Sequence, residues 1–278
     1  MPELPEVETV RRQLEERVLG ERIISVSVTG RRTIRRQPKE EFSARLASRT
    51  IVAARRWGKF LLVDLDGGEV LVIHLRMSGQ LRLEEDPDNA PSAHTHVRLG
   101  LSSSRELRFV DPRTFGELFV ADDLDGRGLP REIAHLGCDP IVEELSGEAL
   151  GRLCAHRRIA LKTLLLDQRI VAGIGNIYGD EICHQARVRP TRPAGTLTKK
   201  EYSRVAAATR AILEQAICEQ GSTLGDQRYR DLVGGLGTFQ DHHEVYGRAG
   251  HACHRCGTTI RRQILAGRSA HYCPRCQR

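Results

Sequence analysis

The sequence predicts an α+β protein built from an N-terminal β-sandwich with an N-terminal helix, a helical domain, and a small C-terminal β-hairpin that holds a metal ion. Short runs of alternating apolar and polar residues between Arg22 and Val120 are typical of a sandwich. Helical periodicity replaces this alternation from Ile141. Two Cys-x-x-Cys pairs then close the chain. We place the domains at residues 1–130, 131–246 and 247–278.

Composition favours a polyanionic partner and argues against a membrane. The 278 residues include 43 Lys and Arg against 36 Asp and Glu, which gives a net charge of +7. No apolar run approaches the roughly 20 residues of a membrane span, and the N-terminus lacks a basic-then-apolar signal peptide. Eight cysteines without an export signal favour reduced thiols or a metal site over disulfides. We therefore expect a cytoplasmic protein with no membrane partner.

The first residues predict a helix. Pro5 suits the first helical position, Glu6 and Glu8 suit the first turn, and Gly20 ends the run. Apolar residues follow one another at spacings of three and four: Val7, Val10, Leu14 and Val18. These spacings predict one buried face along the helix.

The residue before this helix predicts a reactive amine. Initiator methionine is usually removed when proline follows, so we expect the mature chain to begin at Pro2, whose secondary amine can attack a carbonyl carbon. The Glu3 carboxylate stands beside it. The helix dipole disfavours the ammonium form of the amine and the nearby acids favour it, and the sequence leaves this balance open. A simpler alternative is that Met1–Glu6 only starts a helix.

The strand region contains one clear hairpin. The runs Phe60–Leu65 and Glu69–Leu75 flank the turn Asp66-Gly67-Gly68. The acidic stretch Glu84–Pro91 is expected to be a loop. Alternating apolar residues predict two further strands, one with Ile24, Val26 and Val28 and the other with Val97, Leu99 and Leu101.

The helical region has one strong start signal and one glycine-rich link. Thr198-Lys199-Lys200-Glu201 forms a capping box and opens a long helix that runs to Gly221. Upstream, the segment Val171–Tyr178 links a helix that contains Leu164–Leu166 to a second helix. Its closely spaced glycines would let backbone N–H groups reach a phosphate, although Gly-x-Gly often marks only a turn.

Four cysteines predict one structural zinc site. Cys253 and Cys256 are separated by 16 residues from Cys273 and Cys276, and two such knuckles present four thiolates for tetrahedral Zn²⁺. Three nearby histidines could substitute as ligands, namely His251, His254 and His271. The remaining thiols lack this spacing and are interpreted as buried apolar residues: Cys138, Cys154, Cys183 and Cys218.

The C-terminal segment is strongly basic. From Arg248 onward it carries seven arginines and no acid. Arg261, Arg262 and Arg268 lie between the two cysteine pairs, where a zinc-stapled hairpin could hold them as a grip for phosphate. A solvated basic face is the alternative for Arg261 and Arg262.

Several of these motifs resemble one family. Met1-Pro2-Glu3-Leu4-Pro5-Glu6-Val7-Glu8-Thr9-Val10 resembles the amino terminus of formamidopyrimidine-DNA glycosylases, the bacterial enzymes that excise oxidised purines. Val171–Tyr178 resembles the helix–two-turn–helix of that family, and Ala266–Cys273 resembles its zinc finger. In all, five separate motifs stand in the order of the family.

The resemblance implies a bifunctional DNA glycosylase and abasic-site lyase. Pro2 would attack C1′ of a flipped nucleotide, and Glu3 would act as acid and base at the sugar. Lys59 would approach the reactive centre and bind phosphate, although on its own it reads as a solvated surface lysine. Arg268 would bind phosphate and assist the second elimination, and Glu6 would help to position this end of the chain.

The resemblance also implies a set of DNA contacts. His74 would bind phosphate, though a lone histidine on a strand is more often a core residue. His94 would contact DNA unless it and His96 are only exposed loop residues, and Asn176 would hydrogen-bond the backbone beside the lesion. Residues matching Met77, Arg113 and Phe115 would fill the gap left by the flipped nucleotide. Thr114 departs from the family, in which many relatives carry a second arginine there.

The expected substrate is double-stranded DNA that contains an oxidised base, bound by a monomer in the bacterial cytoplasm and nucleoid. Gly221–Leu224 resembles the start of the family's lesion-reading loop, but Gly225–Arg230 departs from the usual pattern. The resemblance also implies a preference for purine lesions, meaning 8-oxoguanine and formamidopyrimidines, because Glu3-Leu4-Pro5 stands where the endonuclease VIII branch typically has Glu-Gly-Pro.

Three alternatives stay open at this point. One is a non-catalytic zinc-finger DNA-binding protein, which would need no free amine at Pro2. A second is a paralogue of the family that prefers oxidised pyrimidines or abasic sites. The third is a tautomerase with an N-terminal proline, which would need neither the zinc module nor the arginine-rich tail.

Overall fold

The computed structural model describes residues 2–30, 32–225 and 228–278. Met1, which we expect to be removed, lies outside the described residues. So do Asp226 and Gln227, two of the residues at which the sequence departs from the usual pattern of the family's lesion-reading loop. The chain divides into two units, one formed by Met1–His135 with Gln220–Thr238 and the other by Leu136–Glu219 with Phe239–Arg278. Among the described residues, no helix combines the length and the apolar character needed to cross a membrane.

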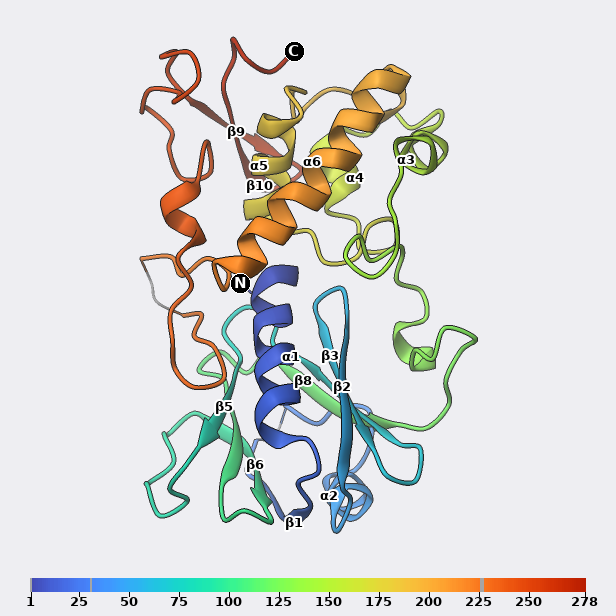
Figure 1. Ribbon diagram of the computed structural model, residues 1–278, viewed down its shortest axis with the longest axis vertical. Helices are drawn as coiled ribbons and strands as arrows, with labels where there is room; N and C mark the ends of the chain where they lie inside the picture. The colour runs from blue at the N-terminus through green and yellow to red at the C-terminus, as the bar shows by residue number, and fades with distance from the viewer. Residues whose placement is uncertain (1, 31, 226–227) are drawn as a thin grey trace. The chain divides into compact units, whose positions relative to one another are not determined.

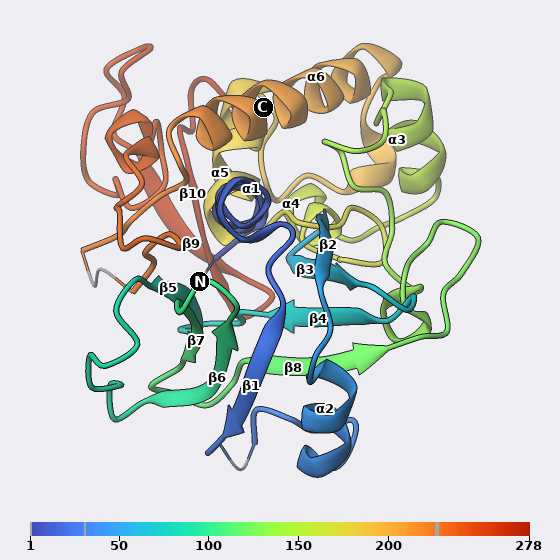
Figure 2. The ribbon, with the colours of Figure 1, turned by 60° about the horizontal axis from the view of Figure 1, so that its bottom comes forward.

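The first unit contains a β-sandwich, as predicted. Its two sheets have four antiparallel strands each, in the orders β2-β3-β4-β8 and β1-β6-β7-β5 (Figure 2). The strands are β1 (Ile23–Val28), β2 (Ile51–Trp57), β3 (Phe60–Leu65), β4 (Val70–His74), β5 (Gln80–Glu84), β6 (Thr95–Leu101), β7 (Glu106–Val110) and β8 (Glu117–Ala121). A short 3₁₀ turn, η1 (Arg131–Ile133), follows the sandwich.

All three strand predictions are confirmed, although burial along β1 departs from simple alternation. Strands β3 and β4 form the expected hairpin, and every second residue of β6 is buried. In β1, however, Ile24 is exposed and Ile23 is buried. The pairing with β6 shifts between Ile23 and Ser25, and such an irregularity moves the residues that follow to the other face.

The prediction of strands throughout this region also missed one helix. Helix α2 (Lys39–Leu46) begins after Pro38, which fits the proline preference near helix starts. Phe42 and Leu46 lie four residues apart and are buried, so this helix covers part of the core. A helix of eight residues gives too short a periodic pattern to be distinguished from alternation.

Helix α1 (Leu4–Val18) confirms the predicted N-terminal helix and corrects its start. Its N-cap is Glu3, so Leu4 is the first helical residue and Pro5 the second. The helix lies along β2 and β3 (Figure 1). Its apolar face belongs to the same buried core as residues of both sheets, through Val7, Val10, Leu14 and Val18. Only Glu6 of the two predicted acids lies in the first turn.

The second unit is helical with one β-hairpin. Its helices are α3 (Gly147–Cys154), α4 (Leu161–Leu165), α5 (Asn176–Gln185) and α6 (Lys199–Cys218), with short 3₁₀ turns η2 (Ala194–Thr196) and η3 (Phe239–His242). Strands β9 (Arg261–Leu265) and β10 (Arg268–Tyr272) form the hairpin. The predicted capping box between Thr198 and Glu201 is present at the start of α6. Helix α5 packs against both α6 and β10.

Candidate functional site

The start of α1 fixes the residue next to the proposed nucleophile. The Glu3 backbone N–H donates to Oε2 of Glu6 at 2.7 Å, and the Glu3 carboxylate accepts the backbone N–H of Glu6. Both side chains are buried, and Pro2 is buried beside them. Because both ends of this capping box are occupied, the backbone at Pro2 is held at the positive end of the helix.

The second oxygen of Glu6 holds a segment from much later in the chain. Oε1 of Glu6 accepts the backbone N–H of Ser222 at 2.8 Å. A Cβ on the preceding Gly221 would lie 2.6 Å from that oxygen, and Gly221 has a φ of +82°. Glycine is therefore required here on two grounds, the close approach and the left-handed backbone. Glu6 thus joins the helix start to the neck of the segment Gln220–Thr238.

Tyr229 anchors the same segment, a role that the sequence analysis missed. Its hydroxyl donates to the carbonyl oxygen of Gln220 at 3.0 Å, and its ring lies in the sandwich core. Burial and the Glu6 carboxylate raise the pKa of Tyr229 well above its ordinary value. At the neck, Ser222 pairs with Thr238. The only signal in the sequence is an aromatic residue in a Gly-rich stretch, three positions before the buried Leu232.

Lys59 is buried, so its interpretation as a solvated surface lysine is wrong. It lies in the turn between β2 and β3 and is 7% exposed. Arg56, also buried, pairs with Glu8 of α1 at 3.0 Å and donates to the carbonyl oxygen of Gly58 at 2.9 Å. These two interactions fasten the turn that carries Lys59 to the N-terminal half of α1.

His74 lies at the end of β4 in a neutral state. Its Nδ1 accepts the backbone N–H of Arg76 at 2.9 Å, which places its proton on Nε2. Burial, with the cations of Arg76 and Lys59 nearby, holds the pKa of His74 well below its ordinary value. The ring also packs edge-on against Phe60, with centroids 4.3 Å apart. The residue is buried, as the core-histidine alternative required, and still offers a neutral N–H donor.

Met77, Arg113 and Phe115, which are expected to fill the gap that a flipped nucleotide leaves in DNA, lie on exposed turns of the sandwich. Met77 and Phe115 are 39% and 44% exposed. The guanidinium carbon of Arg113 lies 4.9 Å from the centroid of the Phe115 ring, within the range of a cation–π contact. His94 is exposed, and its carbonyl oxygen accepts the backbone N–H of Asp111, which begins the turn that carries Arg113 and Phe115.

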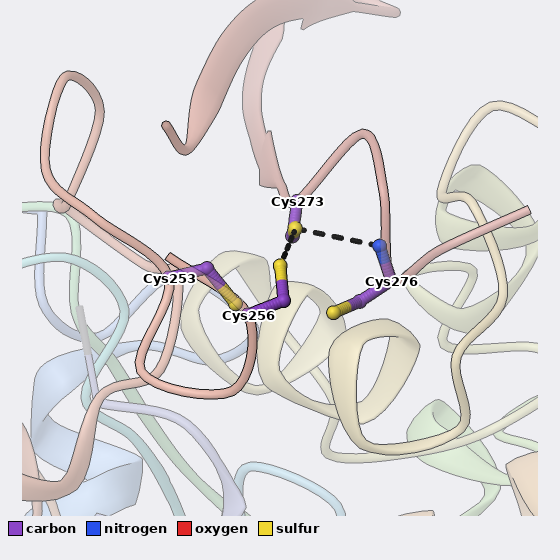
Figure 3. Close-up of side chains that lie close together, drawn as sticks. All are labelled: Cys253, Cys256, Cys273 and Cys276. Carbon is purple, nitrogen blue, oxygen red and sulfur yellow. Dashed lines mark hydrogen bonds between the residues drawn. The ribbon is translucent and has the colours of Figure 1, made fainter. Parts of the chain in front are cut away.

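The four predicted cysteines form one cluster in the second unit. The sulfur atoms of Cys253, Cys256, Cys273 and Cys276 all lie within 4.8 Å of one another (Figure 3). Four thiolates around Zn²⁺ at about 2.3 Å would have sulfurs about 3.8 Å apart, so the donor set and its spacing fit one structural zinc ion.

In the described part of the chain, the cluster of ligand atoms includes none of the three nearby histidines. Nδ1 of His271 lies 3.0 Å from Asp180, and Nδ1 of His254 lies 3.1 Å from Arg248. Within the described ranges, the grouped ligand atoms come from the four cysteines alone. The expectation that all other thiols are buried is wrong for Cys218, which is exposed, and for Cys138, which is half-buried.

His184 supports the cluster and was not identified from the sequence. It is fully buried in α5, and its Nε2 lies 3.7 Å from the sulfur of Cys253. Burial and the Arg255 guanidinium lower the pKa of His184 to about 4, so the neutral ring can donate an N–H to a thiolate. A histidine 69 residues before a cysteine gives no local signal of this contact.

Asn176 is the first residue of α5, after the N-cap Gly175. Gln168 shapes the link before it: its side chain donates to the carbonyl oxygen of Ile174 at 2.8 Å and accepts the N–H of Gly173 at 2.9 Å. Oδ1 of Asn176 is buried without a hydrogen-bond partner in the described part of the chain. The backbone N–H groups at this helix start suit a phosphate or another anion, whereas Oδ1 can only accept a hydrogen bond from a donor.

Arg268 is exposed at the start of β10, on a strand that is firmly held. Lys162 of α4 and Asp180 of α5 form a buried ion pair at 2.6 Å. Lys162 also donates to the carbonyl oxygen of Ser269 at 2.6 Å, and Asp180 accepts the backbone N–H of His271 at 2.9 Å. Both contacts are to the backbone of β10 just after Arg268, at Ser269 and His271, so the guanidinium projects from a strand whose backbone is held.

Comparison with known proteins gives one consistent result. Residues 1–118 match the model of the formamidopyrimidine-DNA glycosylase N-terminal domain, residues 136–228 match that of the H2TH domain of the same glycosylase, and residues 250–278 match a zinc finger found in FPG and IleRS. The formamidopyrimidine-DNA glycosylase of Thermus thermophilus is 45% identical over 278 residues, covering 100% of this chain and 98% of the relative.

Solved structures agree over the whole chain. The MutM (FPG) protein of Thermus thermophilus superposes with a TM-score of 0.88 at 43% identity, covering 99% of this chain and 98% of that one. A Lactococcus lactis FPG mutant bound to DNA containing Fapy-dG gives a TM-score of 0.89 at 31% identity, with 100% of both chains covered. Lactococcus lactis Fpg bound to DNA with an abasic site gives 0.89 at 31% identity, with 99% of both covered.

The cysteine cluster predicts zinc dependence. The purified protein should carry about one zinc ion per chain, and Cys253→Ser should weaken zinc binding by more than about 100-fold and lower the melting temperature, because a ligand is lost. Metal analysis and thermal unfolding measure both. Cys218→Ser, on an exposed thiol outside the cluster, is the matched control and should change neither. An unchanged zinc affinity and melting temperature in the Cys253→Ser variant would contradict the assignment.

Proposed function

Because the chain belongs to the formamidopyrimidine-DNA glycosylase family, we propose that it is a bifunctional DNA glycosylase and abasic-site lyase of base excision repair. The observation that carries this proposal is the buried capping box of Glu3 and Glu6, which holds Pro2 at the start of α1. The zinc cluster alone would equally suit a non-catalytic DNA-binding protein, but such a protein has no use for an amine held in this way. A tautomerase would need neither the cluster nor Arg268.

The proposed chemistry begins at the amine of Pro2, after removal of Met1. Its lone pair forms a bond to C1′ of the damaged nucleotide, and the bond from C1′ to the base breaks, so the base leaves with that electron pair and takes up a proton. The nitrogen of Pro2 loses its proton, Glu3 donates a proton to O4′ as the C1′–O4′ bond breaks, and the nitrogen lone pair forms the C1′=N⁺ bond of an iminium. Loss of a proton from C2′ then expels the 3′ phosphate, and a second elimination expels the 5′ phosphate.

The proposed DNA contacts rest on groups with suitable chemistry. Lys59 supplies a positive charge close to His74, and His74 supplies a neutral N–H donor. Arg268 stands on a clamped strand, where it would bind phosphate and assist the second elimination. Asn176 and His94 would add contacts to the DNA backbone. The net charge of +7 supports association with this polyanion.

The proposed substrates are duplexes with 8-oxoguanine opposite cytosine or with formamidopyrimidines. The Lactococcus lactis relative has been solved with DNA containing Fapy-dG. The anchored segment Gln220–Thr238 supports a loop that reads the base, since its neck is tied to the same carboxylate that holds the helix start. The same relative was also solved with DNA containing an oxidised pyrimidine, so slower excision of pyrimidine lesions is part of the proposal.

We also propose the oligomeric state, the location in the cell and the domain boundaries. The protein would act as a monomer on DNA in the bacterial cytoplasm, associated with the nucleoid through that DNA. The catalytic domain would span residues 1–130, the helical domain with the lesion loop residues 131–246, and the zinc finger residues 247–278. The segment Gln220–Thr238 would then fold onto the first of these domains while belonging in sequence to the second.

Borohydride trapping tests the nucleophile. The wild-type protein should be trapped covalently on duplex DNA with one abasic site, and Pro2→Gly should reduce strand cleavage at least about tenfold because the secondary amine is lost. A retained N-terminal tag should abolish trapping, since an acylated nitrogen cannot form an iminium. Pro5→Ala is the matched control and should still be trapped. Undiminished trapping of the tagged protein would exclude Pro2.

The loop can be tested separately from the amine. Residues 224–228 are replaced by a Gly-Ser linker of equal length, with Thr223 and Tyr229 kept because they anchor the segment. Excision of 8-oxoguanine should fall at least about tenfold, while cleavage at an abasic site should stay within about threefold, since only the first needs the base to be held. Single-turnover rates on the two duplexes measure the difference. Equal losses would show that this loop does not read the lesion.

A further inference from the structure

Two segments of the sandwich cross from one sheet to the other side by side. Residues 75–79 connect β4 to β5, and residues 111–116 connect β7 to β8. In each sheet the strands that bound them are neighbours, β4 with β8 and β5 with β7 (Figure 2). At the crossings, His74 pairs with Glu117 and Gln80 pairs with Val110. Met77 lies on the first crossing, and Arg113 and Phe115 lie on the second. We call these three residues the wedge.

Each crossing contains a non-glycine residue in the left-handed region next to a wedge residue. Arg76, before Met77, has a φ of 54°, and Thr114, between Arg113 and Phe115, also has a φ of 54°. Such conformations are unfavourable for residues with a Cβ and persist only where the surroundings enforce them. Both crossings must therefore be held by strong contacts.

One buried carboxylate supplies these contacts to both crossings. Asp111 is 0% exposed. Its Oδ1 accepts the hydroxyl of Ser78 at 2.6 Å and the N–H of Arg113 at 3.2 Å, and its Oδ2 accepts the N–H of Gly116 at 2.7 Å. Ser78 belongs to the first crossing and the other two donors to the second. Hydrogen bonds to an ionised acceptor are stronger than neutral ones, so this carboxylate ties the two crossings together.

The backbone of Asp111 is held as well. Its N–H donates to the carbonyl oxygen of His94 at 2.9 Å, and its own carbonyl oxygen accepts from Nε2 of His96 at 2.8 Å. The carboxylate is therefore not free to follow either crossing if one of them moves.

Both crossings also rest on the same aromatic ring. A Cβ on Gly79 would lie 2.9 Å from Cζ of Phe109, and a Cβ on Gly116 would collide with the same ring. Phe109 is itself buried in the core. The glycines let the two crossings close over the ring, and Asp111 then fixes them from within.

From this geometry we propose that Asp111 is the positioning residue of the wedge. It holds Met77 at a fixed position relative to Arg113 and Phe115 before DNA binds. The two crossings therefore lose little conformational entropy when the wedge unstacks a base step. The inference rests on the proposed function, because the wedge acts only if the protein displaces a base from duplex DNA. Asp111 itself touches neither the base nor the sugar in this account.

Asp111→Asn tests the proposal with the shape of the side chain preserved. An amide cannot accept hydrogen bonds at both of its ends, so one crossing loses its tie. Single-turnover excision of 8-oxoguanine should fall about 10- to 100-fold, while cleavage at an abasic site should change less than about threefold, because no base has to be displaced there. With 2-aminopurine beside the lesion, the rise in fluorescence on binding should be largely lost. Asp88→Asn, on an exposed loop, is the matched control.

Zinc content and melting temperature establish that the variant is folded. If Asp111→Asn does not fold, Ser78→Ala carries the test, since it removes only the tie to the first crossing; it should slow excision by about threefold or more and spare abasic-site cleavage. Wild-type rates on both substrates, or equal losses on both, would overturn the assignment of Asp111. Failure of the wild-type protein to excise 8-oxoguanine would overturn the proposed function instead.

Discussion

The proposed active site depends on the two hydrogen bonds that the Glu6 carboxylate accepts. One oxygen accepts the N–H of Glu3 and the other accepts the N–H of Ser222, so the helix start and the loop neck share one buried group. A buried carboxylate that loses a donor costs free energy, so neither segment can shift without a penalty. The end that carries Pro2 and the segment proposed to read the base are thereby kept in one arrangement.

The same physical device recurs at two other places. Asp111 accepts hydrogen bonds from both crossings of the sandwich. Asp180 accepts the backbone N–H of His271 in the β9–β10 hairpin and also forms an ion pair with Lys162. In each case a carboxylate excluded from water binds segments that are distant in sequence. Exposed groups such as Phe115 and Arg268 then project from backbone that is already fixed, which lowers the entropy lost when they contact a ligand.

Features set by short-range spacing were predicted from the sequence, and features set by tertiary contacts were not. Metal-ligand spacing located Cys253 and its partners, and a capping box located the start of α6. The burial of Lys59 was missed because it depends on how the β2–β3 turn packs against α1. The bond between Glu6 and Ser222 joins residues 216 positions apart, and no local pattern marks it.

Locating the covalent bond in the trapped complex tests most directly whether Pro2 is the nucleophile. The borohydride-reduced complex with abasic-site DNA is digested with nuclease and protease, and the peptides are sequenced by mass spectrometry. The sugar fragment should be on the nitrogen of Pro2, in a peptide that lacks Met1. A fragment on the side-chain amine of Lys59, with Pro2 unmodified, would contradict this prediction.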